Sequence, residues 1–473
     1  MSPVETAVLA LYYAVLSVLA VYSVHRFHLV RLRRRLPLPA RVTANVFPPL
    51  TVQLPLFNES NVAARLIDAV ASLEYPGALD IQVLDDSTDE TSAIVAERVI
   101  AWTSRGVRIA QIRRSARDGY KAGALAEGMR RSDAHLFAIF DADFVPQPDT
   151  LLRMVPYFAD ARIGMVQARW THLNREQSLL TRVQALFLDA HFAVESAARN
   201  FSGRFFNFNG TAGIWRRDAI EDAGGWSSST LTEDLDLSYR AQLAGWEFAF
   251  VNDVEIPAEL PAALSGFQDQ QHRWAKGSLQ TARKLLGAIA RSDAERSVKT
   301  EAFFHLTNNT AYLLSLALAL LIVPALLLRY KYQLLWTFAI DFALFAMSSG
   351  SVLLFYREGQ RWAGRPAPSW RELFAVLPVG VGMSVRNASA VIEGLVQKGG
   401  HFKRTPKAGD GIARASRRSR LPVAETALTL FFASVVIAFA MAQRWGSLPF
   451  LSLFVTGYGY VAVLALSERR SVT

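Results

Sequence analysis

Long apolar stretches near both ends of the chain enclose a middle region with a different hydrophobic pattern. The first stretch, from Val4 to Val24, is about 20 residues long, which is enough to cross a bilayer as a helix. Arginines follow it at positions 26, 31 and 33–35. Basic residues mark the cytoplasmic end of a span, and a cleaved signal peptide carries its charge before the apolar run. We therefore expect an uncleaved anchor with its N-terminus outside, the alternative being a helix buried in a soluble core.

The apolar pattern returns after Lys299 and predicts four more spans. They run from Leu313 to Leu328, within a stretch that begins near Phe303, and over Leu334–Phe355, Leu421–Met441 and Leu448–Leu466. Segment 373–396 is also apolar, but it contains charged residues and lies between two basic loops. Because the positive-inside rule places both loops in the cytoplasm, we expect this helix to lie in the membrane interface.

Between these regions, short apolar segments end in acidic or glycine-rich positions and alternate with helical patterns. The clearest are LTVQLPLFNES, IQVLDDSTDET, VRIAQIRR and HLFAIFDADFVP. Such alternation predicts an α/β domain around a mostly parallel sheet, with ligands at the carboxyl ends of the strands. The predicted organisation is an anchor (1–25), a basic linker (26–47), a cytoplasmic α/β domain (48–285), an interfacial linker (286–302), two spans (303–356), an interfacial helix (373–396), a basic cytoplasmic loop (397–420), two spans (421–467) and a cytoplasmic tail (468–473).

The composition agrees with a membrane protein and excludes several kinds of site. Only 19% of the 473 residues are charged, against about 25% in soluble domains, and 51% are hydrophobic. The absence of cysteine excludes disulfides, thiolate metal sites and cysteine nucleophiles. The net charge of +10 comes largely from basic blocks beside the spans, so we expect it to meet membrane lipids and not nucleic acid.

Carboxylates end two of the predicted strands. Asp141 and Asp143 flank Ala142, an arrangement in which two oxygen ligands converge on a hard divalent cation and leave positions open for phosphate. Asp85 and Asp86 end another strand, where a carboxylate can accept hydrogen bonds from a base or a ribose. The alternatives are an acidic surface turn for the first pair and a helix N-cap region for the second.

Two glycine-rich segments offer room for a ligand. Lys121 lies between Gly119 and Gly123 at a predicted helix start, which suits a diphosphate, although a solvated lysine is the default interpretation. Asn209 and Gly210 lie in FNFNGTAGIWRR, where the lack of side chains would let a substrate approach the backbone.

Two polar motifs accompany later helices. Thr232, Glu233 and Asp234 precede a helical pattern, where Asp234 suits a general base with a raised pKa if it faces the cleft. These acids can instead compensate the helix dipole. The segment from Gln270 to Trp274 offers an amide for hydroxyls, Arg273 for a phosphate or carboxylate, and an indole for a sugar ring, or else it forms an amphipathic surface helix.

Taken together and in this order, the motifs resemble those of glycosyltransferase family 2, in its processive cellulose-synthase-like branch. The matching signatures are Asp86, Asp141-Ala142-Asp143, Thr232-Glu233-Asp234 and the Q-x-x-R-W that starts at Gln270. The strings QVLDDSTDET, GYKAGALAEGM, FDADFVP, FNFNGTAGIWR and QQHRW are most similar to the plant cellulose-synthase-like A and C groups and their bacterial relatives. Those groups make β-1,4-mannan or glucomannan and a β-1,4-glucan backbone. The resemblance covers residues 48–285.

The resemblance implies a cytoplasmic α/β GT-A domain, Rossmann-like and nucleotide-sugar-binding, joined to an α-helical transmembrane region. It makes Asp234 the catalytic base, and it makes Asp141 and Asp143 catalytic residues that hold the donor and its Mg²⁺ or Mn²⁺. Asp86 would contact the nucleotide, and Lys121 would lie near the diphosphate. The residues that it assigns to substrate binding are Asp85, Asp86, Lys121, Asn209, Gly210, Glu233, Gln270, Arg273 and Trp274. The last three of these would contact the acceptor.

The leading hypothesis is an inverting membrane enzyme that transfers hexose from GDP-mannose or UDP-glucose to a growing β-1,4-linked polysaccharide, processively and with export through its own spans. The alternative is transfer of one sugar to a lipid acceptor, as in ceramide and polyprenyl-phosphate glycosyltransferases. A transporter or a nucleic-acid-binding membrane protein is the third possibility, since Asp341 and Glu393 fall in apolar segments, but such acids are few. The short sequence after Leu466 predicts no cyclic-dinucleotide-binding barrel of the kind found in bacterial cellulose synthases.

Overall fold

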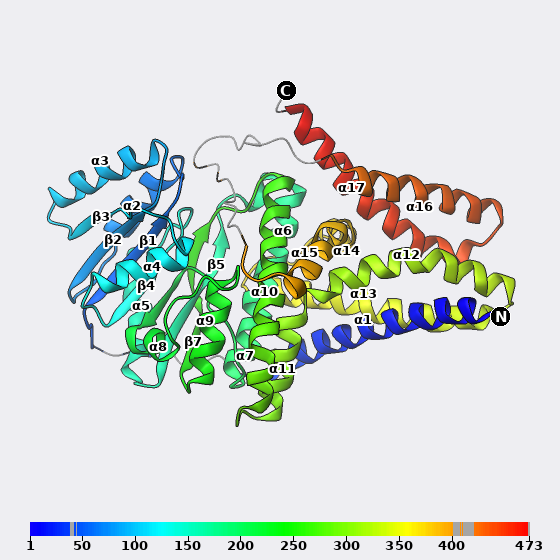
Figure 1. The fold of residues 1–473 in the computed structure, drawn as a ribbon, viewed down its shortest axis with the longest axis horizontal. Helices are drawn as coiled ribbons and strands as arrows, with labels where there is room; N and C mark the ends of the chain where they lie inside the picture. The colour runs from blue at the N-terminus through cyan, green and yellow to red at the C-terminus, as the bar shows by residue number, and fades with distance from the viewer. Residues whose placement is uncertain (38–41, 44, 401–406, 408, 410–420, 472–473) are drawn as a thin grey trace.

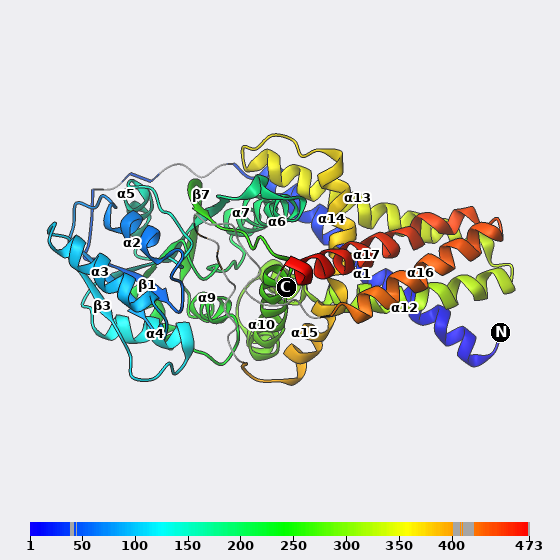
Figure 2. The same ribbon diagram turned by 90° about the horizontal axis from the view of Figure 1, so that it is seen from above.

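The computed structural model describes residues 1–37, 42–43, 45–400, 407, 409 and 421–471. An α/β domain occupies one end of the molecule, and a bundle of long helices extends away from it (Figure 1). Two helices, α6 (Leu179–Ala190) and α10 (Leu264–Arg291), lie between these two parts (Figure 2).

The described residues of the α/β domain form one seven-stranded sheet. Its strands are β1 (Leu50–Leu56), β2 (Leu79–Asp85), β3 (Ile109–Ile112), β4 (Leu136–Ile139), β5 (Ile163–His172), β6 (Gly213–Arg216) and β7 (Glu247–Ala258). Their order is β3-β2-β1-β4-β6-β5-β7. All neighbouring pairs are parallel except those of β6, which is antiparallel to both β4 and β5, so β5 points the same way as β4. The expected α/β fold with a mostly parallel sheet is confirmed.

Helices cover both faces of this sheet, which explains why the central strand β4, LFAI, is apolar and buried at every position. In β4, Leu136 and Ala138 pack into one core cluster with helices on one face of the sheet, whereas Phe137 and Ile139 pack into a second cluster with helices on the other face. The helices of this domain are α2 (Ala63–Ala71), α3 (Thr91–Thr103), α4 (Tyr120–Arg130), α5 (Thr150–Met154), the π-helical segment His191–Ser196, α7 (Ala197–Phe201), α8 (Arg217–Asp222) and α9 (Glu233–Leu243). Short 3₁₀ helices lie at Val155–Ala159, Arg175–Gln177, Leu335–Thr337 and Trp445–Ser447.

The remaining helices belong to the membrane region or lead into it. They are α1 (Pro3–Arg35), α11 (Arg296–Thr307), α12 (Thr310–Lys331), α13 (Phe338–Trp362), α14 (Trp370–Gly382), α15 (Ser384–Val396), α16 (Val423–Met441) and α17 (Leu448–Ser471). Among the described residues, five helical segments are long and apolar enough to cross a membrane, and they contain α1, α12, α13, α16 and α17. These segments mark the chain as a membrane protein. α14 and α15 form a bent pair with an angle of 52°, so the predicted interfacial helix is broken in two.

The arginine block after the first span is structured differently from the predicted linker. α1 continues through it to Arg35, and the side chain of Arg33 is buried. The Arg33 guanidinium lies 3.9 Å from the ring centroid of Trp362, and its Nε donates to the carbonyl oxygen of Ala193 at 3.2 Å. A planar guanidinium tolerates this environment because it stacks on aromatic rings. The expectation that these arginines meet lipid is therefore wrong for Arg33.

Other predicted segments end at different places or lie outside the described residues. The apolar stretch that begins near Phe303 is divided between α11 and α12, with the break at Asn308 and Asn309. The predicted basic loop at 397–420 lies outside the described residues except for 397–400, Lys407 and Gly409. The predicted linker at 26–47 lacks 38–41 and 44, and the predicted tail lacks 472–473.

Candidate active site

A polar pocket opens at the edge of the sheet where β1, β2, β4 and β5 end. The start of α9 and one side of α10 form further walls. The pocket is lined by every predicted site residue except Asp85, namely Asp86, Lys121, Asp141, Asp143, Asn209, Gly210, Glu233, Asp234, Gln270, Arg273 and Trp274. Motifs that lie between residues 86 and 274 therefore share one cavity.

Asp141 and Asp143 follow β4, and each faces a lysine. Lys121 Nζ lies 2.5 Å from Asp141 Oδ1 and also donates to the carbonyl oxygen of Gly210 at 2.8 Å. Lys407 Nζ lies 2.7 Å from Asp143 Oδ2. Each carboxylate of the pair thus has a cationic nitrogen beside it.

These two carboxylates fit a divalent cation that is bound together with a diphosphate. The described residues contain no group of three or more His, Asp or Glu side chains that could hold a metal on its own. Mg²⁺ and Mn²⁺ prefer oxygen ligands, and in nucleotide sites Mg²⁺ takes one or two carboxylates and completes its shell with phosphate oxygens and water. A lysine ammonium group lies beside each of Asp141 and Asp143, which shows that the space next to these carboxylates favours positive charge.

Lys121 reaches the pocket because α4 starts directly before it. Gly119 has a φ of 69°, in the left-handed region that glycine adopts without strain, and the helix begins at the next residue. Burial lowers the pKa of Lys121, but the carboxylates of Asp141 and Glu233 raise it by a larger amount. The pKa of Lys121 is therefore higher than its ordinary value. A charged ammonium on the first turn of a helix is suited to a diphosphate.

Asp234 lies on the first turn of α9, in a setting that changes its acidity. Burial and the neighbouring charge of Glu233 raise the pKa of Asp234 to about 7, against the opposing effect of Lys121. The backbone of Gly210 passes close to it, since a Cβ at Gly210 would lie 3.1 Å from Asp234 Oδ2. A carboxylate with a pKa near neutrality can accept a proton from a hydroxyl and release it again, which a general base requires.

Asp86 and Asp85 have different surroundings. Arg114 donates to both carboxylate oxygens of Asp86, from Nε at 3.0 Å and from Nη2 at 2.5 Å. Beside Asp86 the pocket is lined by Arg117, whose guanidinium lies 3.4 Å from the ring centroid of Phe57. Asp85 is buried and accepts hydrogen bonds from Ser87, Ser92 and Gln111. It therefore organises the loop after β2 and does not reach the pocket.

α10 carries the last motif on the side that faces the pocket. Gln270, Arg273 and Trp274 all line the cavity. One helical turn later, Gly277 brings α10 against the start of α9, because a Cβ there would lie only 2.5 Å from Thr232 Cγ2. The absence of a side chain at Gly277 thus sets the spacing between the two motifs.

α10 also contacts the membrane region through α15. Lys276 Nζ donates to Glu393 Oε2 at 3.0 Å, and Arg386 forms an ion pair with Asp269. The charged residues of segment 373–396, Arg386 and Glu393, therefore pair with residues of α10. This pairing agrees with neither a transport path nor a lipid contact for Glu393.

Some lining residues were not identified from the sequence. Arg117 lies two residues before Gly119, and Lys407 lies in the basic segment HFKRTPK, so cations near a glycine-rich turn and in a basic loop were the available signals. Trp170 and His172 end β5 without a recognisable motif, and only the pairing of β5 with β6 and β7 places them in the pocket.

Comparison with known proteins identifies relatives along most of the chain. A family model described as "Glycosyltransferase like family 2" matches residues 48–277. Probable glucomannan 4-beta-mannosyltransferase 9 of Oryza sativa subsp. japonica is 35% identical over 457 residues, which cover 90% of this chain and 84% of the relative. Glucomannan 4-beta-mannosyltransferase 1 of the same species is 42% identical over 294 residues, 59% of this chain and 56% of the relative. Glucomannan 4-beta-mannosyltransferase 2 of Arabidopsis thaliana is 45% identical over 256 residues, 53% of this chain and 48% of the relative.

The chain thus spans about half the length of the last two relatives. Among solved structures, the mannosyltransferase PcManGT from Pyrobaculum calidifontis, in complex with GDP-Man and Mn²⁺, is similar with a TM-score of 0.56 and 19% identity. That likeness covers 82% of this chain and 99% of PcManGT, and it agrees with the GT-A type of fold. The chain belongs to glycosyltransferase family 2, in the cellulose-synthase-like branch that contains the glucomannan 4-β-mannosyltransferases.

Proposed function

We propose that the protein is an inverting membrane glycosyltransferase that adds mannose from GDP-mannose to a growing β-1,4-linked mannan or glucomannan. The observation that carries this proposal is the pocket in which all four family signatures meet, in a chain that aligns with 84% of a probable glucomannan 4-beta-mannosyltransferase. The complex of PcManGT with GDP-Man adds support for the donor. UDP-glucose is the second donor to be tested.

The reaction is a single displacement at the anomeric carbon of the donor sugar. A hydroxyl of the acceptor attacks this carbon, Asp234 takes the hydroxyl proton, and the bond to the diphosphate oxygen breaks. Because the attack comes from the face opposite the leaving group, an α-linked donor yields a β-linked product. One base is sufficient, and no covalent intermediate with the protein forms.

The charge of the departing nucleoside diphosphate needs compensation. Asp141 and Asp143 would hold Mg²⁺ or Mn²⁺, which when bound neutralises the negative charge that develops on the leaving group. Lys121 remains protonated and contributes a fixed positive charge beside Asp141. Arg117 and Asp86 line the end of the pocket beyond these groups, where the nucleoside would lie.

The acceptor would enter from the side of α10, where Gln270, Arg273 and Trp274 line the pocket. An indole offers a flat apolar face to a sugar ring. α10 also contacts α15, so the acceptor end of the pocket lies next to the membrane region. In this proposal the α/β domain is cytoplasmic, the N-terminus lies outside, and the α14–α15 pair lies in the interface while the product leaves between the spans.

The test uses the purified full-length protein in lipid nanodiscs. GDP-[¹⁴C]mannose or UDP-[¹⁴C]glucose is supplied with Mn²⁺ or Mg²⁺, and the product is digested with β-1,4-mannanase or with cellulase. We expect polymeric, mannanase-sensitive product that requires the divalent cation. Asp234→Asn should lower the rate by about 100-fold or more, because general base catalysis contributes that much, while the exposed Asp218→Asn serves as the matched control.

Each alternative gives a different result. A product that carries one sugar on a lipid would contradict polymer synthesis and support the lipid-transfer reaction. Cellulase-sensitive product from UDP-glucose would change the donor and leave the reaction class intact. If the Asp234→Asn variant formed product at the wild-type rate, the assignment of Asp234 as the base would be contradicted.

A further inference from the structure

His172 lines the candidate active site although it belongs to none of the family motifs. It is the last residue of β5, and since β5 and β4 point the same way, it lies at the same edge of the sheet as Asp141. Across the sheet, Asp86 follows β2, Asp141 follows β4, and β5 is two strands further on. His172 therefore lies on the side of the pocket away from the proposed nucleoside end.

The imidazole of His172 is buried and faces a carboxylate. Only 3% of the His172 side chain and 1% of the Asp189 side chain are exposed. The distance from His172 Nε2 to Asp189 Oδ1 is 3.4 Å, and neither atom has a hydrogen-bond partner in the described part of the chain. Among the described residues His172 Nδ1 makes no hydrogen bond and, unlike Nε2, it is not fully buried, which leaves it for a ligand of the pocket that His172 lines.

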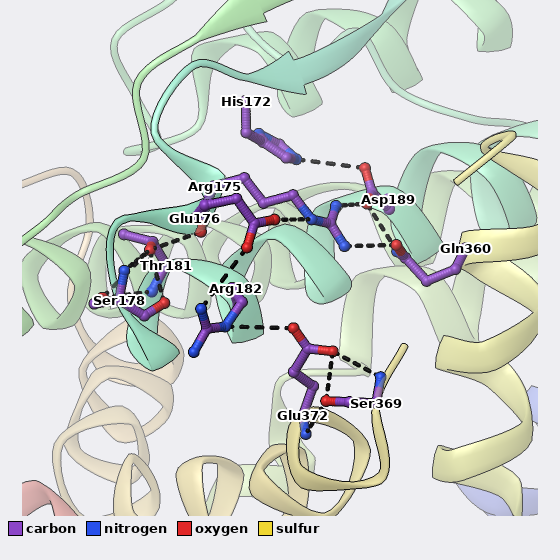
Figure 3. Close-up of polar contacts among 10 residues, drawn as sticks. All are labelled: His172, Arg175, Glu176, Ser178, Thr181, Arg182, Asp189, Gln360, Ser369 and Glu372. Carbon is purple, nitrogen blue, oxygen red and sulfur yellow. Dashed lines mark hydrogen bonds and ion pairs between the residues drawn. The ribbon is translucent and has the colours of Figure 1, made fainter. Parts of the chain in front are cut away.

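Asp189 is itself held from the opposite side, as the close-up shows (Figure 3). Arg175 donates to Asp189 Oδ2 at 2.6 Å, and Gln360 Nε2 donates to the same oxygen at 2.7 Å. Burial by itself raises the pKa of Asp189, but His172, Gln360 and Arg175 together lower it below its ordinary value. The carboxylate is therefore ionised at neutral pH, and its second oxygen is left for His172.

Gln360 connects this group to the membrane region. It lies on α13, and Arg175 donates to its Oε1 at 2.6 Å. Its neighbour Gly359 lets α13 approach α6 closely, because a Cβ at Gly359 would lie 2.6 Å from Ala190 Cα. Close contact between the two backbones thus fixes Gln360 beside Asp189, and the position of the His172 ring depends on how α13 packs on the catalytic domain.

We propose that His172 binds a hydroxyl group of the acceptor sugar and that Asp189 positions it for that role. This inference rests on the proposed glycosyl transfer. An ionised carboxylate beside Nε2 favours the tautomer with its proton there, which leaves Nδ1 as a hydrogen-bond acceptor for a sugar hydroxyl. Leu188 and Trp170 line the same pocket and supply apolar surface for the ring of that sugar.

The test measures acceptor binding separately from transfer, with the full chain in nanodiscs. Fluorescence anisotropy gives the dissociation constant of labelled β-1,4-mannohexaose, and transfer from GDP-mannose gives the KM of the same acceptor and of the donor. The variants are H172F, which fills the space without a polar atom, H172N, whose amide keeps a polar atom near the position of Nδ1, and D189N. H135F replaces an exposed histidine outside the pocket and is the matched control.

For H172F and D189N, we expect about tenfold increases in the dissociation constant and in the acceptor KM, with an unchanged KM for GDP-mannose. For H172N and H135F, the dissociation constant and the acceptor KM should stay within about twofold of the wild-type values. Wild-type affinity in H172F would overturn the hydroxyl contact, and weak binding in H172F together with wild-type binding in D189N would overturn the positioning role. GDP binding reports whether the pocket is folded. If H172F does not bind GDP, H172L takes its place in the comparison. A wild-type protein that binds mannohexaose without elongating it would contradict the proposed function, and the comparison of dissociation constants would still test His172.

Discussion

At the scale of single residues, Asp234 combines two requirements that oppose each other. As the proposed base, it must be buried to meet a sugar away from bulk water, and it must be ionised to accept a proton. Burial and Glu233 raise its pKa to about 7, and Lys121 limits the rise. The pocket therefore holds a carboxylate that is half ionised near neutral pH, which suits reversible proton transfer.

We predict a pH dependence of kcat/KM from this shift. The pKa of Asp234 is raised from 3.8 to about 7, so the group is protonated and inactive as a base below that value. Activity should fall about tenfold for each pH unit below 7 and level off above it. Rates measured from pH 5 to 9 check this. Glu233→Gln removes the charge that helps to raise the pKa and should move the midpoint to lower pH, whereas an unmoved midpoint would contradict the assigned cause.

A second prediction concerns the close contact between Gly210 and Asp234. Gly210 has a φ of 83°, and a Cβ there would lie 3.1 Å from Asp234 Oδ2 and 3.7 Å from Lys121 Nζ. Gly210→Ala should reduce the transfer rate by about 100-fold, through backbone strain and displacement of the base. Gly203→Ala is the matched control, since Gly203 has a φ of 70° and nothing within 4 Å of the added Cβ. Equal losses in the two variants would assign the effect to backbone strain alone.

At the scale of elements, α10 links the proposed acceptor end of the pocket, the start of α9 and the membrane region. Trp274 faces the pocket, Gly277 contacts Thr232, and Lys276 pairs with Glu393 on α15. A shift of this helix would change all three contacts together. The proposed catalysis and the docking of the membrane helices therefore both depend on its position.

Two glycines on this helix allow a matched test. Gly277→Ala would place a Cβ 2.5 Å from Thr232 Cγ2, which forces α10 and α9 apart. We expect its transfer rate to fall by about tenfold or more, because small displacements of a site are costly. Gly287→Ala meets only Arg291 at 3.5 Å and should stabilise the helix by about 1 kcal/mol. Activity and thermal unfolding of both variants check this, and full activity of Gly277→Ala would show that the contact is accommodated elsewhere.

At the scale of the whole molecule, a buried ion pair holds long helices together at the end far from the α/β domain (Figure 1). Arg329 on α12 is fully buried and pairs with Asp341 on α13. Tyr12 on α1 donates to Asp341 Oδ2 at 3.1 Å. Asp341 thus joins three helices and has a structural role, and the sequence-based suggestion of a transport residue has no support in this arrangement.

Breaking this pair should destabilise the protein without changing its chemistry. Asp341→Leu leaves Arg329 buried without its partner, which costs about 3–5 kcal/mol. The double variant Arg329→Met with Asp341→Leu should be more stable than the single one, because no charge is left unpaired. Thermal unfolding in detergent measures both, and the KM for the donor should be unchanged in the folded protein. A double variant less stable than Asp341→Leu would contradict this account.

Much of the fold and of the site was predictable from the sequence because it follows from local pattern. Apolar segments that lead into Asp86 and Asp141 are strands whose carboxyl ends meet at the pocket, and Lys121 and Asp234 each lie at a helix start. Helix length and hydropathy alone predict the five membrane segments. These features require no knowledge of which distant segments meet.

The sequence by itself determined the class of domain, the family and the positions of its motifs, since each depends on residues close together in the chain. Only the tertiary structure decided that Asp85 turns away from the pocket and that Arg33 is buried on Trp362. It also decided that His172 reaches the pocket from β5 and that Asp234 has a pKa of about 7. The physical reason is that burial, charge pairing and acidity depend on neighbours supplied by other strands and helices, and local periodicity carries no information about them.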